Sequence, residues 1–417
     1  MEVVDKKKAL VPVLRFSDYT EPLKRVELKS LIEEGRKIRY GIVQPGKYDP
    51  NGRFMIRGQD YSEVKGWGDI NDFFRVSDIV EAKYKKARVK GGDLLITIVG
   101  AGTGWFEEVP QFLTGANITQ TTGRVAVDKE KAAPIFVKNY FESTYGKKEI
   151  SKYIKGQAQP GLNIGDVEIF KLTLPTLPEQ QKIAAFLSAV DEKIQQLTKK
   201  KALLEQYKKG VMQKLFPKKA GQAPELRFKK PDGSNYPDWE EKKLGEVIDF
   251  YNGKGHEQSV VEDGQFTIVN SKFISTEGRV QKFCNEQIFP LIKGDLVMVM
   301  SDIPNGKALA KCYIIEKDET YSLNQRICCL RKKEAVQEFL FYIVSRNKYY
   351  LAFDSGVGQT NLKKAEVLNC PLNIPSKEEQ QKIADFLSGI DQKINQVETQ
   401  INQTQTFKKG LLQQMFV

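Results

Sequence analysis

The chain has 417 residues, with 65 lysines and arginines against 53 aspartates and glutamates, which gives a formal net charge of +12 at pH 7. This length suffices for two or three domains with separate cores, and the positive balance favours a polyanionic partner, most commonly nucleic acid. No apolar run of about 18 residues and no signal-peptide pattern occurs, so we expect no membrane partner and a cytoplasmic location.

The N-terminal part of the chain, residues 1–173, is expected to form one globular domain that starts with a tail over residues 1–20. Short apolar, β-branched runs at 94–99 and 123–127 predict buried strands, and the pattern PIFVKNYFESTYG predicts a helix over 134–146. Strands broken by glycine, asparagine and aspartate, together with a helix, are typical of a mixed α+β domain with long loops.

A long helix is predicted over residues 174–216, where the chain reads PTLPEQQKIAAFLSAVDEKI near its start. Its apolar residues recur at alternating steps of four and three, a period of about 3.5 that keeps one seam facing a partner helix. Lys201 and Lys208 interrupt this seam. Thr176 followed by Glu179 fits a capping box at the start of the helix.

The same helix is written a second time, 200 residues later, where residues 375–416 match residues 175–216 at 19 of 42 positions. Two matched seams in one chain supply each other's partner, which favours an intramolecular pair. The alternative is that each helix lies only on its own neighbouring domain. The predicted seam positions are Ile183, Leu187, Val190, Ile194 and Leu197, then Ile383, Leu387, Ile390, Ile394 and Val397.

The second half of the chain repeats the plan of the first. Residues 217–237, rich in lysine, proline and glycine, predict an extended linker. Residues 238–372 predict a second globular domain with a helix over 335–349, and residues 373–417 hold the second long helix. PVLRF recurs as PELRF and VKGGDLLITI as IKGDLVMVM, whereas GKYDPNGRFMIRGQDYSEVKGWG has no convincing counterpart. A shared scaffold with divergent parts is expected of a protein that recognises two different things.

Motifs for catalysis are lacking. The GAGTG stretch at 100–104 resembles a glycine-rich nucleotide or S-adenosylmethionine loop, but no helical pattern follows it, so a tight turn at a strand end is preferred. Pro231-Asp232 with Glu241-Lys242-Lys243 fits a loose metal-nuclease pattern that arises by chance in a chain rich in lysine and glutamate. Without a Walker A motif, HExxH or GxSxG, the chain is predicted to be non-catalytic, with no cofactor or metal of its own.

The cysteines and the single histidine give little functional signal. All five cysteines lie in the second half without CxxC spacing, so they predict neither a disulfide framework nor a zinc site, and we expect core or strand positions. His256 lies in the loop-like stretch NGKGHEQ and is expected to be a surface or contact residue.

Binding to DNA would require cations for phosphates and polar side chains for base edges. The run EAKYKKARVK concentrates positive charge in the first domain, although a solvated surface explains any single lysine equally well. The loops GQAQPGLN and GVGQTNLK recur at the 200-residue offset, so their shared glutamines are either base contacts or a common structural contact. The candidate DNA contacts are Arg57, Gln59, Lys83, Lys85, Lys86, Arg88, Gln157, Gln159, His256, Gln258, Ser271, Lys272, Gln359, Asn361, Lys363 and Lys364, with Lys90, Lys147, Lys148, Lys152 and Lys155 as further phosphate contacts.

The whole chain resembles the specificity (S) subunits of type I restriction–modification enzymes. The resemblance rests on the paired PEQQKIAAFLSAVDEKI and KEEQQKIADFLSGIDQKI helices, the endings KKGVMQKLF and KKGLLQQMF, the entry segment WEEKKLGEV and the KGDL turn. It implies two target-recognition domains separated by two long conserved helices that pack as an antiparallel coiled coil, with a pseudo-two-fold tandem repeat.

The resemblance also implies a set of partners. Each domain would read one half of an interrupted sequence in double-stranded DNA, with the helices setting the spacer. Two modification (methyltransferase) subunits and two restriction subunits would bind the same chain, so that S-adenosylmethionine, ATP and magnesium belong to the partner subunits. The exposed helix faces would receive the modification subunits, through Gln180, Gln181, Lys182, Asp191, Lys193 and their equivalents in the second helix.

Two other functions stay open at this point. One is the recognition chain of another multisubunit restriction system, and the other is a stand-alone DNA-binding scaffold. The absence of a helix-turn-helix or zinc module from the sequence disfavours the stand-alone protein.

Overall fold

The computed structural model describes residues 11–62, 66–156, 158–217, 222–256, 258–303, 307–354 and 356–417. The chain divides into two compact units, and each unit combines one globular part with portions of both long helices. Unit 1 comprises the described part of Met1–Thr198 together with Glu398–Val417, and unit 2 is Lys199–Val397.

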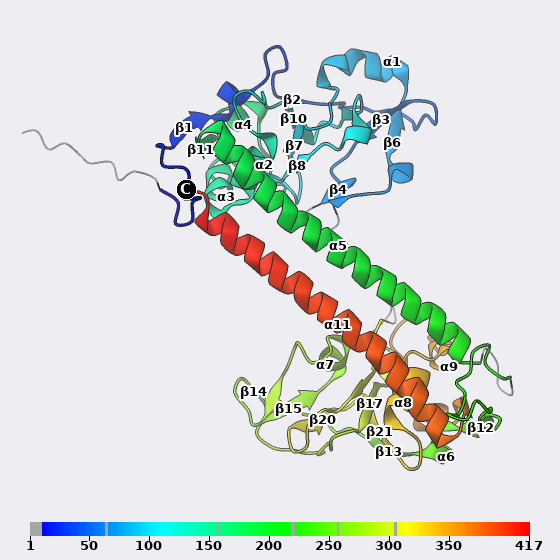
Figure 1. Cartoon of the computed structure of the whole chain (residues 1–417). Coiled ribbons are helices and arrows are strands. Elements are labelled where there is room, and N and C mark those ends of the chain that lie inside the picture. Colours follow the sequence, from blue (N-terminus) through cyan, green and yellow to red (C-terminus); the bar gives the residue numbers. More distant parts are fainter. Residues whose placement is uncertain are drawn as a thin grey trace, which may run out of the picture. The chain divides into compact units, whose positions relative to one another are not determined.

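Unit 1 is built on a four-stranded sheet and a three-stranded sheet (Figure 1). An antiparallel strand pair brings together the points where the chain enters and leaves its globular part. That pair is β1 (Lys24–Glu27) with β11 (Lys171–Leu174); the larger sheet has the order β2 (Arg39–Tyr40), β10 (Thr122–Val125), β7 (Leu94–Thr97), β8 (Phe106–Glu108); the smaller has β6 (Phe74–Val76), β3 (Arg53–Ile56), β9 (Asn117–Ile118); and β4 (Tyr61–Ser62) pairs with β5 (Gly66–Trp67).

The helices of unit 1 are short, and the predicted helix over 134–146 is in fact two helices. Ser143 has extended backbone angles, φ −66° and ψ 165°, and its hydroxyl accepts a hydrogen bond from the Gly146 amide, which caps the second helix. The helices are α1 (Asp78–Glu81), α2 (Pro134–Glu142), α3 (Thr144–Ser151) and α4 (Ile164–Glu168), with 3-10 turns η1 (Leu28–Leu31), η2 (Ile70–Asp72), η3 (Ala82–Ala87) and η4 (Gln111–Leu113).

Unit 2 repeats this plan, and its predicted helix over 335–349 is likewise divided. Its closing strand pair is β12 (Glu240–Lys243) with β23 (Pro371–Ile374); one four-stranded sheet has the order β13 (Ile248–Asn252), β21 (Ile327–Lys332), β17 (Leu296–Val299), β19 (Cys312–Ile314); the other has β14 (Val260–Val261), β16 (Phe283–Cys284), β15 (Phe266–Val269), β20 (Tyr321–Leu323); and β18 (Ser301–Asp302) pairs with β22 (Thr360–Asn361). The helices are α6 (Leu244–Val247), α7 (Ser271–Ser275), α8 (Gln337–Val344), α9 (Lys348–Leu351) and α10 (Lys364–Leu368).

The smaller sheet of unit 1 has a topological counterpart in unit 2. β3 pairs parallel with β9 and antiparallel with β6, while β15 pairs parallel with β20 and antiparallel with β16. The stretch around β3, for which sequence comparison finds no counterpart, therefore occupies the same place in the fold as the stretch around β15. Strand pairing preserves this equivalence although the side chains have diverged.

Two long helices complete both units, α5 (Leu177–Leu215, 39 residues) and α11 (Lys377–Gln414, 38 residues). In unit 1 the start of α5 packs on the end of α11, with Ile183 and Leu187 in the same core cluster as Leu411 and Met415 (Figure 1). In unit 2 the end of α5 packs on the start of α11. The two helices therefore run antiparallel, and the predicted α+β fold class with a tandem repeat is confirmed.

All the predicted seam positions are buried apart from Ile194, which is half-buried. Two equivalent lysines at the seam, Lys208 of α5 and Lys408 of α11, pair with aspartates of the opposite helix, whereas Lys201 lies 3.9 Å from Glu205 of its own helix. Lys408 contacts Asp191 at 2.8 Å in unit 1, and Lys208 contacts Asp391 at 2.6 Å in unit 2. Asp191 is thus engaged within unit 1, which corrects its assignment to an exposed docking face.

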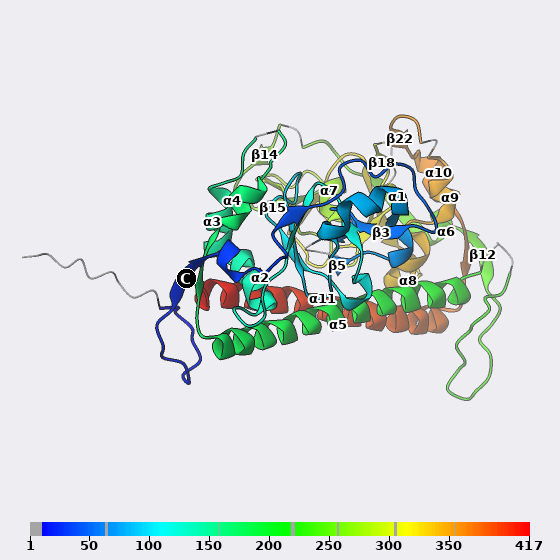
Figure 2. The same cartoon turned by 90° about the horizontal axis from the view of Figure 1, so that it is seen from above.

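The last residues of the chain are part of the unit 1 core. Phe416 packs against Phe136 of α2, with ring centroids 5.2 Å apart, and Lys408 pairs with Glu142 at 3.2 Å. Figure 2 shows the end of α11 beside α2. The Leu14 amide donates to the Gln414 carbonyl at 2.9 Å. In unit 2 the Leu226 amide makes the corresponding bond to the Lys214 carbonyl at 3.0 Å.

The two LRF segments are fastened to the starts of the long helices. Arg15 donates from Nε and Nη2 to both carboxylate oxygens of Glu179, at 2.8 and 2.7 Å. Arg227, within the predicted linker, makes the same paired contact with Glu379, which also accepts a hydrogen bond from Trp239 Nε1 at 3.2 Å. Glu179, predicted for a capping box, thus uses its carboxylate in a buried ion pair, and the equivalent Glu379 does the same.

Within the described ranges, none of the helices has the length and apolar character needed to cross a membrane.

Candidate nucleic-acid interface

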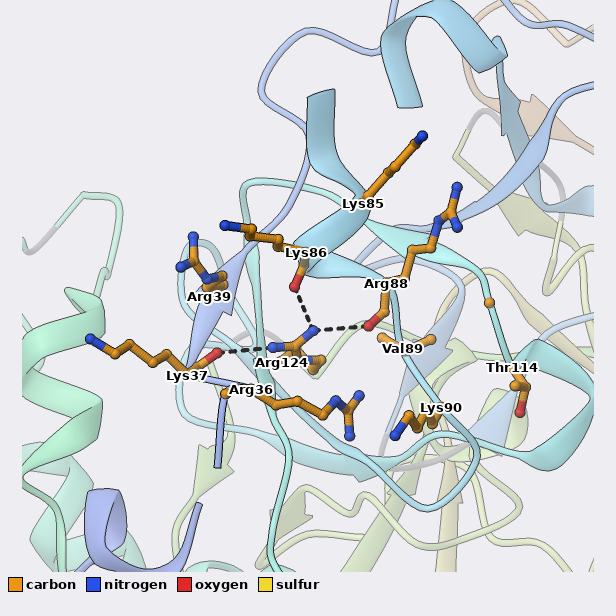
Figure 3. A pocket seen from close by; sticks show the side chains of 12 residues that line it. Arg36, Lys37, Arg39, Lys85, Lys86, Arg88, Val89, Lys90, Thr114 and Arg124 are labelled. Atoms are coloured by element: carbon orange, nitrogen blue, oxygen red, sulfur yellow. Dashed lines mark hydrogen bonds between the residues drawn. The ribbon is translucent and has the colours of Figure 1, made fainter. Parts of the chain in front are cut away.

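Unit 1 contains a strongly basic cavity of 490 Å³ (Figure 3). Its walls come from the segment leading into β2, the end of η3 and the turn after η4, with β10 contributing one side chain. Eight of its twelve lining residues are cationic. The lining residues are Gly35, Arg36, Lys37, Arg39, Lys85, Lys86, Arg88, Val89, Lys90, Thr114, Gly115 and Arg124.

Arg124 lies at the centre of this cavity and holds its walls together. Its side chain is almost fully buried, with 3% of the residue exposed. Nη1 donates to the carbonyls of Lys86 and Arg88, at 2.6 and 2.9 Å, and Nη2 donates to the Lys37 carbonyl at 3.0 Å (Figure 3). Burial, together with the nearby charge of Arg36, lowers the pKa of Arg124 to about 10, so the guanidinium stays protonated at neutral pH.

Two further arginines of the lining are neutralised by carboxylates behind it. Arg36 makes two hydrogen bonds to Asp93 and a third to Glu33. Arg88 makes two hydrogen bonds to Glu81, and these hold the pKa of the Glu81 carboxyl below its usual range. These pairs fix the backbone on both sides of the cavity.

Four of the remaining cations carry charge that is not paired within the described structure. Lys37, Arg39, Lys85 and Lys86 are exposed, and the part of the chain that the structure describes gives their side chains no hydrogen-bond or ion-pair partner. In Figure 3 these four side chains extend from the backbone around Arg124. Arginine and lysine side chains can only donate hydrogen bonds, so the cavity suits an anion whose oxygens only accept them.

Sequence reasoning found one wall of this cavity and missed the other. Of the predicted residues, Lys85, Lys86 and Arg88 line the cavity together with Lys90, whereas Lys83 is exposed on η3 outside the lining. The missed cations are Arg36, Lys37, Arg39 and Arg124. Two signals could have found them, the basic run RKIRY and a lone arginine inside the buried strand GRVAV.

The other predicted contacts of unit 1 lie outside the cavity lining. Arg57 is half-buried, because its guanidinium bonds to Asp60 and to the Asp72 carbonyl. Gln59 and Gln159 are exposed on loops. Gln157 lies outside the described residues. The lysines at 147, 148, 152 and 155 are likewise exposed and distant in sequence from the lining segments.

In unit 2 the histidine prediction needs correction. His256 is buried, with 2% of the residue exposed, so it is not a surface contact. Its Nδ1 lies 2.9 Å from the Lys254 carbonyl and its Nε2 lies 2.8 Å from Ser322 Oγ. The ring therefore ties a loop to β20. Gln258, Ser271 and Lys272 are exposed.

The repeated glutamine of unit 2 is engaged within its own loop. Gln359 Nε2 donates to Ser301 Oγ at 2.5 Å and to Asn361 Oδ1 at 3.2 Å, which favours the structural contact over a free base reader. Lys363 and Lys364 are exposed at the start of α10, and Lys364 Nζ lies 5.4 Å from the Phe250 ring centroid.

Strand register identifies what unit 2 has in place of the cavity's central cations. Asp93 and Asp295 close the same turn, one residue before β7 and β17. Arg124 faces Leu95 across the sheet, as Cys329 faces Val297, and Arg39 pairs with Arg124 as Tyr251 pairs with Cys329. Cys329 is fully buried in an apolar cluster. The cationic arrangement therefore belongs to unit 1.

The predicted docking faces of the long helices are only partly exposed. Gln180 and Gln380 are buried, which corrects their assignment: each accepts a hydrogen bond from a backbone amide, of Ala133 and Val336 respectively, and donates to a proline carbonyl. Lys182 pairs with Asp18. Exposed positions on these faces include Gln181, Lys193, Gln381 and Lys393.

The two sequence patterns set aside as decoys are structural turns. Residues 100–104 connect β7 to β8, and the Gly104 amide donates to the Thr97 carbonyl at 2.8 Å. Asp232 accepts hydrogen bonds from Ser234 in an exposed turn. All five cysteines are buried and free, and no three metal-binding side chains cluster within the described residues.

The sequence of the chain matches a protein family and several of its members. The model of the type I restriction modification DNA specificity domain matches twice, at residues 26–206 and 236–404. The chain is 29% identical to the type I restriction enzyme MjaVIII specificity subunit of Methanocaldococcus jannaschii over 287 residues, which cover 64% of this chain and 67% of that protein. It is 27% identical over 416 residues to the putative MjaX specificity subunit of the same organism, covering 93% and 91%.

Solved structures share the fold. The S subunit of a type I restriction-modification system from M. genitalium aligns with a TM-score of 0.61 at 17% identity, covering 98% of this chain and 99% of that one. A chain from a structure concerned with complex assembly of the type I R-M system aligns with a TM-score of 0.54 at 16% identity, covering 94% and 97%.

Proposed function

Because this chain belongs to the family defined by the type I restriction modification DNA specificity domain, we propose that it is the non-catalytic recognition subunit of a type I restriction–modification complex. In this role it reads an interrupted target in double-stranded DNA, one half-site per globular part. The observation that carries the proposal is the duplicated scaffold with unlike linings, because two copies of one fold with different surfaces suit two different half-sites.

The long helices support the second part of the proposal, which concerns partners. A helix of 39 residues rises ~58 Å, and we infer that its length contributes to the spacing between the two half-sites. Its repeated exposed positions, Gln181 with Gln381 and Lys193 with Lys393, offer the same surface twice, which suits two copies of a modification subunit. Two restriction subunits complete the proposed complex, and the partner subunits bind S-adenosylmethionine, ATP and magnesium.

A domain exchange tests the division into half-sites. The β1–β11 pair brings the entry and exit of the first globular part together, so residues 28–170 can be replaced by those of a relative with another target while the helices stay unchanged. In cells that also express the neighbouring methyltransferase, we expect the methylated motif to change in one half only. Exchanging residues 244–370 between β12 and β23 is the matched control and should change the other half.

Two results would contradict the proposal. One is a methylated motif that stays the same after both exchanges. The other is DNA methylation by this chain purified alone, because the recognition subunit depends on its partners for chemistry.

A further inference from the structure

The basic cavity of unit 1 supports an inference that rests on the proposed function and assigns the cavity a role within it. We propose that this cavity is a sequence-independent clamp for DNA phosphates, formed by Lys37, Arg39, Lys85 and Lys86 and held in shape by Arg124.

The positive charge of the cavity is only partly compensated. Of its eight cations, Arg36 and Arg88 are matched by Asp93 and Glu81, and Lys90 lies 3.4 Å from Glu33. The four clamp side chains and the buried guanidinium of Arg124 bond to no carboxylate among the described residues. Like charges held together repel, and a bound polyanion relieves that repulsion.

The chemistry of the lining selects phosphate oxygens over base edges. A base edge presents donors and acceptors side by side, whereas a phosphodiester presents acceptors only. The eight charged side chains that line the cavity can only donate hydrogen bonds. Val89 is apolar, and the Thr114 hydroxyl already accepts a hydrogen bond from the Gly91 amide. Among the described residues that line the cavity, none carries an aromatic ring on which a base could stack.

Arg124 is a positioning residue in this clamp. Its three hydrogen bonds end on the backbone carbonyls of Lys37, Lys86 and Arg88, so one side chain fixes the segment carrying Lys37 and Arg39 against the segment carrying Lys85 and Lys86. A buried arginine whose hydrogen bonds end on carbonyls sets spacing without neutralising charge. Unit 2 has Cys329 at this position, which indicates that the clamp anchors only the half-site read by unit 1.

Salt titration of the full-length chain tests the clamp. The probe is a 30-base-pair duplex of about the length needed to cover both half-sites, used in two versions: one with the methylated motif and one scrambled. For the Lys85→Ala/Lys86→Ala variant we expect binding to weaken about tenfold to fiftyfold on both duplexes at ~0.1 M salt, and the slope of log K against log salt to fall by about 2. The methylated motif in cells should stay unchanged.

The matched control is Lys131→Ala, which removes one charge from an exposed lysine of unit 1 that pairs with Asp128 outside the cavity. It should leave the affinity within about twofold and the slope within about 0.3 of the wild-type values. If the double variant binds both duplexes as the wild type does, or if its methylated motif changes in one half, the clamp is overturned while the proposed function stands. Wild-type chain that binds neither duplex and directs no methylation overturns the proposed function itself.

The role of Arg124 is tested by Arg124→Lys and Arg124→Met. If Arg124 positions the clamp, lysine will not restore the affinity or the salt slope, because one ammonium cannot bridge the three carbonyls. If Arg124 acts only by its charge, lysine restores both, which contradicts the positioning role. Thermal unfolding of the same samples identifies a variant that has failed to fold. In that case the slope of log K against log salt for the surface variant Lys37→Ala/Arg39→Ala decides whether the clamp binds phosphates.

Discussion

Unit 1 and unit 2 each close the turn before a central strand with an equivalent aspartate, but the arginine that pairs with this aspartate comes from a different element in each unit. Asp93 accepts from the Lys90 amide and pairs with Arg36, which precedes β2. Asp295 accepts from the Ile292 amide and pairs with Arg331, which lies on β21. The aspartate belongs to the scaffold, whereas the origin of the arginine differs with the surface that each unit builds.

This difference separates two kinds of position. Contacts at the starts of the helices and between the helices are paired between the units: Arg15–Glu179 with Arg227–Glu379, and Lys408–Asp191 with Lys208–Asp391. The positions that line the sheet are not paired, since Arg124 corresponds to Cys329. Substitutions at paired positions should therefore act alike in both units, and substitutions at unpaired positions should not.

The largest effect is expected for Cys329→Arg, which transfers the central cation of unit 1 into unit 2. Cys329 is fully buried among apolar side chains, so the new guanidinium would have to leave water without the three carbonyls that Arg124 finds. We expect a loss of more than about 4 kcal/mol in the free energy of unfolding of unit 2. Hydrogen exchange in α8 measures this loss. Cys329→Val is the control, expected to cost less than about 1.5 kcal/mol, and a tolerated arginine would break the proposed equivalence.

The next effect concerns the paired ion pairs at the starts of the long helices. Glu379→Ala leaves the Arg227 guanidinium without its carboxylate and Trp239 Nε1 without its acceptor, so we expect unit 2 to lose about 4 kcal/mol. Glu179→Ala should cost unit 1 about 3 kcal/mol, because it leaves the Arg15 guanidinium without its carboxylate. Urea unfolding followed by circular dichroism measures both. Glu378→Ala removes the same charge from an exposed neighbour and should cost less than about 1 kcal/mol.

A smaller effect is expected for Gln180→Leu and Gln380→Leu. Each substitution removes the acceptor of a backbone amide, that of Ala133 before α2 or that of Val336 before α8, at a cost of about 2 kcal/mol. The loss should be larger for Gln380→Leu, since the Val336 amide lies in a fully buried hydrogen bond. Thermal unfolding gives the comparison, with the exposed Gln181→Leu as the control within about 0.5 kcal/mol. If both substitutions cost a negligible free energy of unfolding, the hydrogen bonds of Gln180 and Gln380 to the backbone are not part of the common scaffold.

The smallest effect is a pH dependence at the helix seam. Burial disfavours the charge on Lys408, but the carboxylates of Glu142 and Asp191 outweigh burial and raise its pKa. A raised pKa means that the stabilisation is complete below the unfolded value of about 10.4 and is lost as pH rises through the folded value. Wild-type unit 1 should therefore lose stability in that alkaline window by about 1 kcal/mol more than Lys408→Met.

The matched variant in unit 2 is Lys208→Met. Asp391 keeps a hydrogen bond from the Tyr342 hydroxyl at 2.8 Å, so this substitution should cost less at neutral pH than Lys408→Met. Melting temperatures between about pH 8 and pH 11 measure both variants. If Lys408→Met loses as much stability at alkaline pH as the wild type, the pH dependence comes from another group.

The sequence predicted the parts of the fold that depend on periodicity. The 3.5-residue seam and the 200-residue repeat identified both long helices and the duplicated plan, because apolar spacing reports directly on which helix face is buried. The helix breaks at Ser143 and after Val344 were missed, since a short interruption, of one residue at Ser143 and of residues 345–347 in unit 2, leaves the apolar pattern intact.

The candidate site was less accessible to sequence reasoning, because its walls come from segments that are distant along the chain. Lys85, Lys86 and Arg88 form an obvious basic run, whereas their joining to Lys37 and Arg39 depends on the pairing of β2 with β10. His256 was misjudged for a related reason. A histidine in a glycine-rich stretch suggests exposure, but its two ring nitrogens hold the loop to β20 and the ring is buried.

The packing of the last helical turns of α11 into unit 1 has a consequence for biosynthesis. The core of unit 1 includes Leu411, Leu412, Met415 and Phe416, so the globular part that leaves the ribosome first cannot finish folding until the C-terminus has emerged. At about 5–20 residues per second, the intervening stretch delays closure by about 10–40 s. Unit 2, whose residues are contiguous, completes its core during this interval, so the order of folding is the reverse of the order of synthesis.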